Sequence, residues 1–505
     1  MPTFTPAIYL KSSRQNLPLK FSSPIFAKTI LIHYQDIMQR IFLSGLLTLF
    51  MLLHTPARAQ SLESFLADPA FTPASIGICI TDVATGETLV SHNDRQAIIP
   101  ASTVKVITSA TALRLLGSDY RTSTTVGYTG QIDSAGTLHG TLVIRGGGDP
   151  SLGSAYGSRP AEEFVDRVID ALQTQGIRAI EGPIVVDNSL FDGPAVSPKW
   201  MLEDLIWYYA TGCHAFSYRD NQVRIEVRYN GHNYKTARIT PPHSIDLDSW
   251  LLPGDREEVS VTHIGNRYTL TGTIPRQWAR YRLDLAVDHP DSLFLRELHK
   301  QLKQAGIACT EAGQTTEGGP ETQLLDYPSE SLAQLARSLN VHSLNLYAES
   351  LLRHIALASA PRGSAEKGLE TIRSYWQPLG ADSTELFLYD GSGLARNNRV
   401  SARYLTQVLA ATARDPQVGE TFVQSLPLAG SEGSVASFMR NSPLPGELRL
   451  KSGTMSDVHA YAGYYTAPSG KRYTIVLMFN NYTCTRTQLK EKIAAWLTAT
   501  LSKKE

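Results

Sequence analysis

The 505-residue chain lacks the residue patterns that mark metal, redox and many hydrolase sites. Its four cysteines form no C-x-x-C pair, and its thirteen histidines include no H-E-x-x-H pattern. Zinc and dithiol sites need such spacings, so we expect no metal and no cofactor. The chain also has no G-x-S-x-G sequence, which argues against the α/β-hydrolase class.

The cysteines are few and widely spread, at positions 79, 213, 309 and 484. An exported protein could pair them in more than one way, and the sequence leaves the pairing open. Cys79 lies in the apolar run 76–80, which favours a buried core thiol at this position.

Neither sign of charge is in excess. The 47 Lys and Arg residues balance 47 Asp and Glu residues, and the formal net charge is +0. A balanced chain gives no electrostatic support for nucleic-acid binding, so we expect no nucleic-acid partner. With 42% hydrophobic and 19% charged residues, the composition is that of a globular protein whose length allows two or more domains.

Long apolar runs are scarce, and the run near the N-terminus is short. Residues 41–53 follow a basic residue and precede Ala57-Arg58-Ala59, an A-x-A cleavage pattern. This pattern predicts a signal peptide at about 38–59 and export to the periplasm. The run is too short to span a bilayer, so we expect no stable transmembrane anchor, although an N-terminal anchor is the alternative. Residues 1–37 are an upstream extension without a clear role; Met38 is a candidate for the true start, and the sequence leaves the start open.

The most informative feature that is present is Ser102-Thr103-Val104-Lys105, where an extended stretch runs into an alanine-rich helix over about 102–116. A serine in the first turn lies near the positive end of the helix dipole, and a lysine three residues later shares its face. A neutral Lys105 could accept the proton of Ser102, which makes the serine a nucleophile without a histidine. On spacing alone the motif is weak, because S-x-x-K also occurs on solvated helix faces.

Two further motifs follow in a fixed order. Ser343-Leu344-Asn345 lies in a helical stretch, and Lys451-Ser452-Gly453-Thr454 lies in a strand-like stretch. Taken singly, they could be cap residues, a solvated charge and a bulge. A second S-x-N, Ser338-Leu339-Asn340, is an alternative to the first triplet. The order S-x-x-K, S-x-N, K-T/S-G is typical of serine penicillin-binding proteins and β-lactamases, and the combination is far more specific than any one motif.

Alternating and helical patterns indicate how the chain is organised around these motifs. Hairpins are predicted at 75–81 with 87–91 and at 460–466 with 472–480, and a helix at 489–501. A long stretch separates Ser102 from Ser343 and carries helices at 160–176 and 293–306. Its predicted strands are 141–145, 223–229, 259–263, 268–273 and 280–286. We therefore predict a catalytic domain from 60–120 and 322–505, interrupted by an inserted part over 121–321.

The chain resembles the D-alanyl-D-alanine carboxypeptidase/endopeptidases of the class C, low-molecular-mass penicillin-binding proteins (the penicillin-binding protein 4 group, peptidase family S13). The resemblance covers nearly all of the mature chain, including the long insertion, which β-lactamases lack. This chain departs from the usual family pattern at Leu344 and at Ser452. Neither change removes a side-chain group that the expected catalysis requires. Besides the three motifs, the matching stretches are Gly147-Gly148-Asp149-Pro150-Ser151-Leu152, Asp390-Gly391-Ser392-Gly393-Leu394-Ala395-Arg396-Asn397 and Leu426-Pro427-Leu428-Ala429-Gly430.

The resemblance implies a fold and an activity. The expected fold is an α/β (α+β) transpeptidase-like domain of the penicillin-binding and β-lactamase type, with a large, mostly antiparallel β insertion. The expected activity is serine D-Ala-D-Ala carboxypeptidase, endopeptidase or both, on peptidoglycan stem peptides, with acylation by β-lactams. The runner-up is a non-catalytic binding protein that keeps the fold.

The resemblance also implies roles for single residues. Ser102 attacks the substrate carbonyl and Lys105 takes its proton, while Asn345 holds Lys105 and the substrate amide. Ser343 passes a proton to the leaving amine. Lys451, Ser452 and Thr454 bind the terminal carboxylate, with Gly453 between them, and the backbone N–H groups of Ser102 and Thr454 form the oxyanion hole. Arg396 either contacts a substrate carboxylate or braces its loop, and the sequence leaves both open.

Overall fold

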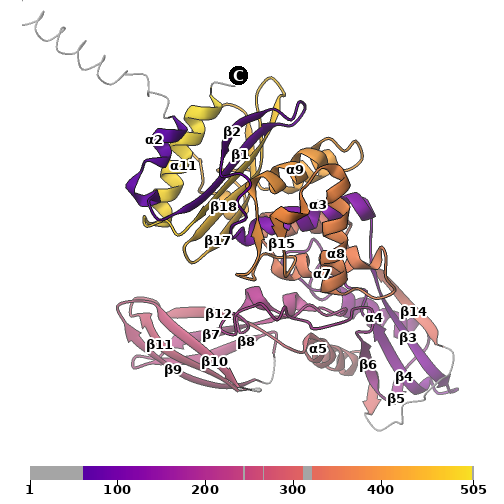
Figure 1. Ribbon diagram of the computed structural model, residues 1–505. Coiled ribbons are helices and arrows are strands. Elements are labelled where there is room, and N and C mark those ends of the chain that lie inside the picture. Colours follow the sequence, from indigo (N-terminus) through magenta and orange to yellow (C-terminus); the bar gives the residue numbers. More distant parts are fainter. Residues whose placement is uncertain (1–60, 243–244, 265–266, 311–320, 503–505) are drawn as a thin grey trace, which may run out of the picture. The chain divides into compact units, whose positions relative to one another are not determined.

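The computed structural model describes residues 61–242, 245–264, 267–310 and 321–502 (Figure 1). The predicted upstream extension and signal peptide lie outside these residues. Within the described part of the chain, no helix is long and apolar enough to cross a membrane.

The catalytic region is built on a five-stranded antiparallel sheet in the order β17-β18-β19-β1-β2. Its strands come from both ends of the chain: β1 (Ser75–Asp82), β2 (Thr88–His92), β17 (Glu447–Met455), β18 (Val458–Thr466) and β19 (Arg472–Asn480). The join between the ends is the β1–β19 ladder, in which Ile78 pairs with Leu477. Both predicted hairpins are confirmed.

Alternating side chains give this sheet two apolar faces. Ile76, Ile78 and Ile80 of β1 pack with α2 (Leu62–Leu66) and α11 (Arg486–Leu501) on one face. Cys79 points to the other face, where it joins the core shared with the helical layer. Figure 1 shows α2 and α11 next to each other on one side of this sheet. The period of two along a strand is the physical reason why one strand serves both cores.

The helical layer surrounds α3 (Val104–Leu116), whose first ten residues are all buried. Its neighbours include α7 (Asn345–Leu357), α6 (Leu332–His342) and α9 (Ala402–Ala413). The layer is completed by α8 (Ala365–Trp376), α10 (Gly419–Ser425) and the two-residue strands β15 (Leu386–Phe387) and β16 (Arg399–Val400). The predicted end of the first helix is correct, because Gly117 caps α3 with φ 86°. Because α3 is buried all round, the residues at its start have a rigid support.

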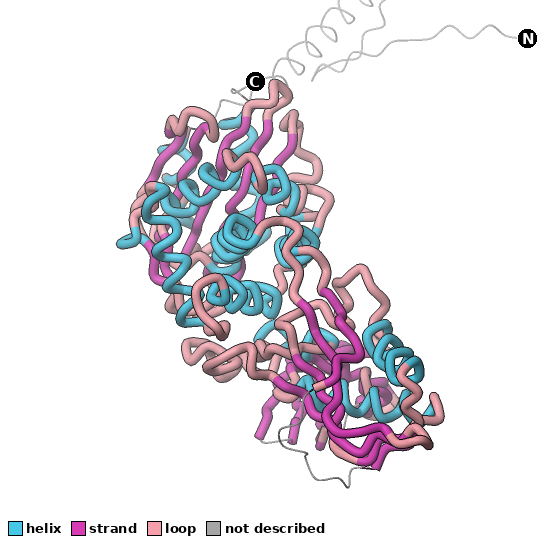
Figure 2. The backbone as a smooth tube through the Cα atoms, turned by 90° about the vertical axis from the view of Figure 1, so that its right-hand side faces the viewer, coloured by secondary structure: helices cyan, strands magenta, loops and turns pink. Residues whose placement is uncertain are grey.

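The inserted part of the chain contains three further sheets, seen from the side in Figure 2. The largest has the order β13-β5-β4-β3-β14, with β6 also paired to β4, and the smaller ones are β12-β7-β8 and β10-β11-β9. Pairing is mostly antiparallel, and the parallel pairs are β9–β11, β4–β5, β4–β6 and β5–β13. The helices α4 (Glu163–Thr174) and α5 (Pro290–Gln304) share an apolar core with these sheets, through residues that include Phe164 and Phe294.

The strands of this part have the following bounds: β3 (Ser123–Ile132), β4 (Thr137–Arg145), β5 (Ala179–Glu181), β6 (Ile184–Asp187), β7 (Gln222–Tyr229), β8 (Tyr234–Thr240), β9 (Asp246–Gly254), β10 (Glu258–Ile264), β11 (Arg267–Pro275), β12 (Arg280–Ala286), β13 (Ala308–Thr310) and β14 (Thr322–Pro328). All five strands and both helices expected from the sequence are present. The strand β14 pairs antiparallel with β3, although the predicted boundary at 321/322 assigns its residues to the catalytic domain. Its partner lies far away in the sequence, so the sequence carried no signal for this pairing.

The four cysteines are all unpaired. Cys79 is buried on β1, as the apolar run around it predicted, and burial raises the pKa of its thiol to about 11. Such a thiol is mostly protonated near neutral pH and behaves as a small apolar side chain.

Candidate active site

Ser102 lies where a 3-10 turn, Ala101–Thr103, leads into α3. Ala101 in this turn is buried and has a left-handed φ of 48°. The turn sits at the N-terminus of α3, so the Ser102 hydroxyl lies near the positive end of the helix dipole. Ser102 is partly exposed and lines a cavity, which is what a nucleophile that meets a substrate requires.

Lys105 lies directly beneath Ser102 and is fully buried. Its Nζ is 3.0 Å from Ser102 Oγ, 2.5 Å from Asn345 Oδ1 and 2.6 Å from the Ser392 carbonyl oxygen. Burial lowers the pKa of Lys105 to about 7, against the opposing charges of Asp390 and Glu349. A lysine with this pKa is partly neutral at pH 7 and can accept the proton of the serine beside it.

Ser343 stands at a break between two helices, and not inside a helix as the sequence pattern suggested. It caps α6 with φ 61° and ψ 41°, and α7 begins at Asn345. A non-glycine residue in this left-handed conformation costs on the order of 1–3 kcal/mol, and such strain is commonly found at functional sites. The break turns the chain so that the Ser343 hydroxyl and the Asn345 side chain line the same cavity as Ser102.

The alternative triplet, residues 338–340, forms no hydrogen bond with Lys105 in the described structure. Asn340 is buried and donates to Ser109 Oγ and Ser425 Oγ, while Ser338 Oγ donates to the Tyr156 carbonyl. The structure therefore brings the later triplet, and not this one, to Lys105.

Asn345 is also held by a residue that sequence reasoning missed. Its Nδ2 donates to the backbone carbonyl of Tyr209 at 2.6 Å. Because a carbonyl only accepts, this contact places the NH₂ group towards Tyr209 and leaves Oδ1 for Lys105.

The third motif lies on β17, the edge strand beside the Ser102 turn. A Cβ on Gly453 would lie 2.6 Å from the Pro100 carbonyl oxygen and 3.0 Å from the Ser102 nitrogen. Glycine is therefore required here for the strand to approach the nucleophile closely. Ser452 is buried, and its hydroxyl donates to Ser434 Oγ at 2.7 Å.

Lys451 is fully buried and does not line the cavity. Its Nζ donates to Ser343 Oγ at 2.9 Å and to the Ser452 carbonyl at 2.6 Å. Burial, together with the charge of Lys105, holds the pKa of Lys451 well below its usual value. Ser343 therefore stands between the Lys451 side chain and the cavity.

Thr454 is the residue of this motif whose side chain reaches the cavity, where it is exposed. Its Oγ1 lies 3.1 Å from His459 Nδ1 on β18. Burial lowers the pKa of His459 to about 3, so the imidazole is neutral beside this hydroxyl.

The cavity has a volume of about 450 Å³ and is shared between the catalytic region and the insertion. Arg396 lines it with an exposed side chain, and no ion pair of this guanidinium is found among the described residues. The insertion contributes further lining residues that the sequence did not reveal: Tyr156, Asp204, Tyr208, Tyr209, Asp220 and Gln222. Nothing in their local sequence marks them, because they reach the site only through the fold. Among the described residues no group of His, Cys, Asp and Glu is arranged to hold a metal ion.

Residues 58–500 match the model of the D-Ala-D-Ala carboxypeptidase 3 (S13) family. This chain belongs to that family. Its activity class is therefore that of the serine D-Ala-D-Ala carboxypeptidases, which are hydrolases.

Relatives within the S13 family span most of the chain. The D-alanyl-D-alanine carboxypeptidase of Actinomadura sp. (strain R39) is 28% identical over 437 residues, which are 82% of this chain and 79% of that protein. The D-alanyl-D-alanine carboxypeptidase DacB of Haemophilus influenzae is 26% identical over 435 residues, 83% of this chain and 88% of that protein. The predicted family is confirmed.

Solved structures show the same fold. Penicillin binding protein 4 (dacB) of Haemophilus influenzae superposes with a TM-score of 0.71 at 24% identity, over 85% of this chain and 96% of that chain. The same protein complexed with a novel β-lactam gives a TM-score of 0.67 at 23% identity, over 85% of this chain and 95% of that chain. The predicted fold class, including the mostly antiparallel insertion, is confirmed.

Proposed function

We propose that this protein cleaves the bond after the penultimate D-alanine of peptidoglycan stem peptides through a Ser102 acyl-enzyme, as a carboxypeptidase, an endopeptidase or both. The observation that carries the proposal is the buried Lys105, whose pKa is lowered to about 7 and whose Nζ lies 3.0 Å from Ser102 Oγ. A base poised near the working pH beside a cavity-lining hydroxyl is the requirement for acyl transfer by serine.

In acylation, Ser102 Oγ attacks the carbonyl carbon of the penultimate D-alanine while its proton passes to Lys105 Nζ. The backbone N–H groups of Ser102 and Thr454 stabilise the oxyanion, with about 3 kcal/mol for each donor. The peptide C–N bond then breaks, and Ser343 gives its proton to the departing amine. Contact of Ser343 Oγ with Lys451 Nζ at 2.9 Å supports this step, because the lysine can replace the proton. Water finally hydrolyses the Ser102 ester.

The terminal carboxylate of the substrate is held by Thr454 and by the charge of Lys451. Thr454 supplies a hydroxyl inside the cavity. The Ser452 hydroxyl donates to Ser434 Oγ and does not line the cavity, so its contribution to carboxylate binding is indirect. Arg396 binds a second substrate carboxylate, since this exposed residue lines the cavity and has no ion-pair partner among the described residues. A β-lactam presents a reactive carbonyl and a carboxylate in similar places, so it acylates Ser102 as well.

The substrate also suggests where the protein works. Peptidoglycan lies outside the inner membrane, which agrees with a signal peptide at about 38–59 and export to the periplasm. N-terminal sequencing of the exported protein should start at or near Gln60, whereas an intact Met38 segment on membrane-bound protein would indicate an anchor. Within the mature chain, the catalytic domain consists of 60–120 and the C-terminal part. The β14–β3 pairing favours a return from the insertion after Pro328, later than the residue 321 suggested by the sequence.

The test of this function is Ser102→Ala, with Ser469→Ala in an exposed hairpin turn as the control. Ser102→Ala should lose both fluorescent-penicillin labelling and D-alanine release from a pentapeptide, with an unchanged circular dichroism spectrum. Full activity in that variant would move the nucleophile elsewhere. Labelling without turnover in the parent would indicate a binding protein instead. Digestion of purified peptidoglycan with product analysis separates carboxypeptidase from endopeptidase activity.

A further inference from the structure

The direction of the lone pair on Lys105 Nζ depends on its two hydrogen-bond partners other than Ser102. A neutral amine has two N–H bonds and one lone pair. The Ser392 carbonyl accepts only, and Asn345 presents its Oδ1, so these two groups take both hydrogens, at 2.6 and 2.5 Å. The lone pair is then left for Ser102 Oγ at 3.0 Å. The groups that hold these two acceptors in place therefore orient the Lys105 lone pair towards Ser102.

The first acceptor is fixed by the insertion. The Tyr209 carbonyl accepts from Asn345 Nδ2 at 2.6 Å and so decides which way the amide faces. Tyr209 belongs to the stretch 196–210, which lies more than a hundred residues before Asn345 in the chain.

The second acceptor lies on a loop held by buried carboxylates. The Ser392–Gly393 peptide has its C=O on Lys105, and its N–H donates to Asp390 Oδ1 at 2.8 Å. Glu349 Oε1 accepts from the N–H groups of Gly391 and Ser392 at 3.0 and 2.9 Å. A peptide with both ends bonded in this way has no freedom to turn its carbonyl away from Lys105.

One of the hydrogen bonds to Asp390 comes from a residue of the insertion. Asp390 Oδ2 accepts from the Ala395 N–H at 2.6 Å and from the indole Nε1 of Trp200 at 2.8 Å. Asp390 is wholly buried, and Trp200 packs with Ala210 and Ala395 in a small apolar cluster. A buried carboxylate that lost one of its donors would be left under-satisfied, which is costly in a site of low dielectric.

We propose that the stretch 196–210 of the insertion is a positioning element for Lys105, in which Trp200 acts through Asp390 on the Ser392 carbonyl and Tyr209 acts on Asn345. The inference rests on the proposed function, because it assigns to Lys105 the role of base. Trp200 is thus a positioning residue that does not need to touch the substrate. The insertion is part of the catalytic apparatus as well as a wall of the cavity.

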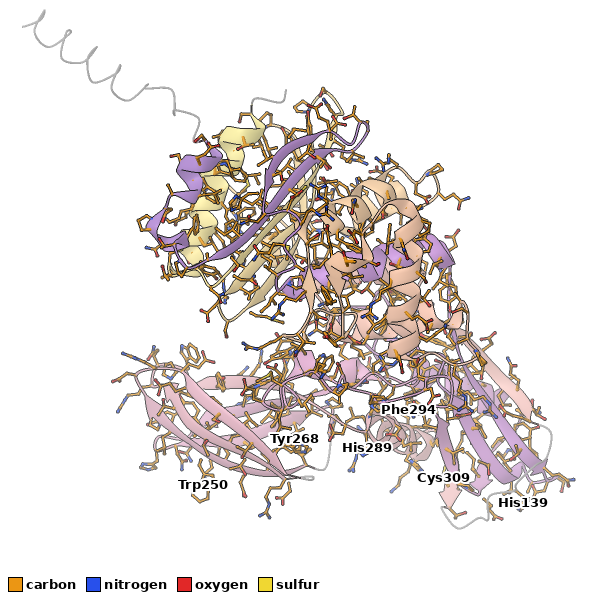
Figure 3. All side chains as sticks on the ribbon, in the orientation of Figure 1. His139, Trp250, Tyr268, His289, Phe294 and Cys309 are labelled. Carbon is orange, nitrogen blue, oxygen red and sulfur yellow. The ribbon has the colours of Figure 1, made fainter. Side chains whose placement is uncertain are left out.

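The experiment uses Trp200→Phe, which removes the indole N–H but keeps an aromatic ring in the cluster. The matched control is Trp250→Phe, the same change at a tryptophan on β9 that is 69% exposed (Figure 3). For each full-length mature variant we would measure the limiting acylation rate and the dissociation constant for a chromogenic penicillin, together with the melting temperature. Asp390→Asn and the double variant complete a double-mutant cycle.

Trp200→Phe should lower the limiting acylation rate at least fivefold, with an unchanged dissociation constant and Ser102 still the labelled residue. The double variant should be no slower than Asp390→Asn, because Trp200 acts through Asp390. A parent rate in Trp200→Phe, an equal loss in Trp250→Phe, or losses that add in the double variant would overturn the inference. If Asp390→Asn does not fold, the comparison of Trp200→Phe with Trp250→Phe decides alone. Absence of Ser102 labelling in the parent would instead refute the proposed function.

Discussion

Lys451 Nζ donates a hydrogen bond to Ser343 Oγ across 2.9 Å and so joins the edge strand β17 to the left-handed break between α6 and α7. The Lys451 side chain is fully buried and does not line the cavity. Two buried lysines therefore serve two serines: Lys105 lies beside Ser102, and Lys451 lies beside Ser343. In the proposed mechanism, Lys105 removes a proton from Ser102 and Lys451 supplies one to Ser343.

Replacement of Lys451 should slow the reaction strongly. Lys451→Ala removes the donor to Ser343 and the charge behind the carboxylate site. Loss of one charge-assisted contact costs about 1.5–3 kcal/mol, or roughly 10- to 150-fold in kcat/KM. We expect acylation by pentapeptide and by penicillin to fall at least about tenfold. Ser452→Ala should do less, because its hydroxyl contacts Ser434 and not Ser343. Acylation of Lys451→Ala at the parent rate would make Arg396 the next candidate for the carboxylate site.

The pH dependence of acylation should report Lys105. Its pKa is lowered from 10.5 to about 7 by burial, and only the neutral amine accepts a proton. The acylation rate should therefore fall as the pH drops through about 7. The charges of Asp390 and Glu349 oppose this lowering, so Asp390→Asn should lower the pKa of Lys105 further and move the fall in rate to lower pH. The measurement is the second-order rate constant with penicillin against pH, and a limb near 10.5 would show that Lys105 is not perturbed.

Gly393 should be needed for more than its backbone conformation. Gly393 and Gly470 have similar φ values, +82° and +84°, so alanine at either position costs roughly 1–2 kcal/mol in backbone strain. A Cβ on Gly393 would also lie 2.0 Å from the Ala101 carbonyl oxygen, whereas a Cβ on Gly470 meets nothing within 4 Å. Gly393→Ala should therefore lower the melting temperature more than Gly470→Ala and should alone slow acylation. Equal effects of the two changes would contradict this close approach.

Arg396 should affect substrate binding and not stability. Arg396 lines the cavity with an exposed side chain and has no ion-pair partner in the part of the chain that the structure describes. Arg396→Ala should raise KM for a stem peptide with an additional free carboxylate, by about tenfold for one charged contact. The melting temperature and KM for a peptide without that carboxylate should stay unchanged. A lower melting temperature with an unchanged KM would show that Arg396 braces its loop.

Local patterns were read correctly from the sequence. The hairpins at both ends, the helix that follows Ser102 and the inserted strands could be predicted because helices and strands are local structures that leave their signals in short runs of residues. The three motifs were found in the same way, since each is a short run. The resemblance to the family rested on these motifs, on the further matching stretches and on the long insertion.

Other features depended on tertiary structure. Ser343 was expected inside a helix. The structure instead places it in a left-handed conformation at the break between α6 and α7, beside the cavity. The direction of the Lys451 ammonium, towards Ser343, depends on a strand and a helix end that are far apart in sequence.

By itself, then, the sequence determined which residues we propose for the chemistry: Ser102, Lys105, Ser343, Asn345 and the third motif. Only the tertiary structure decided what holds them. The contacts of Tyr209 with Asn345 and of Trp200 with Asp390 join residues more than a hundred positions apart. Such contacts follow from how whole sheets and helices pack, and a single sequence carries no local signal for them.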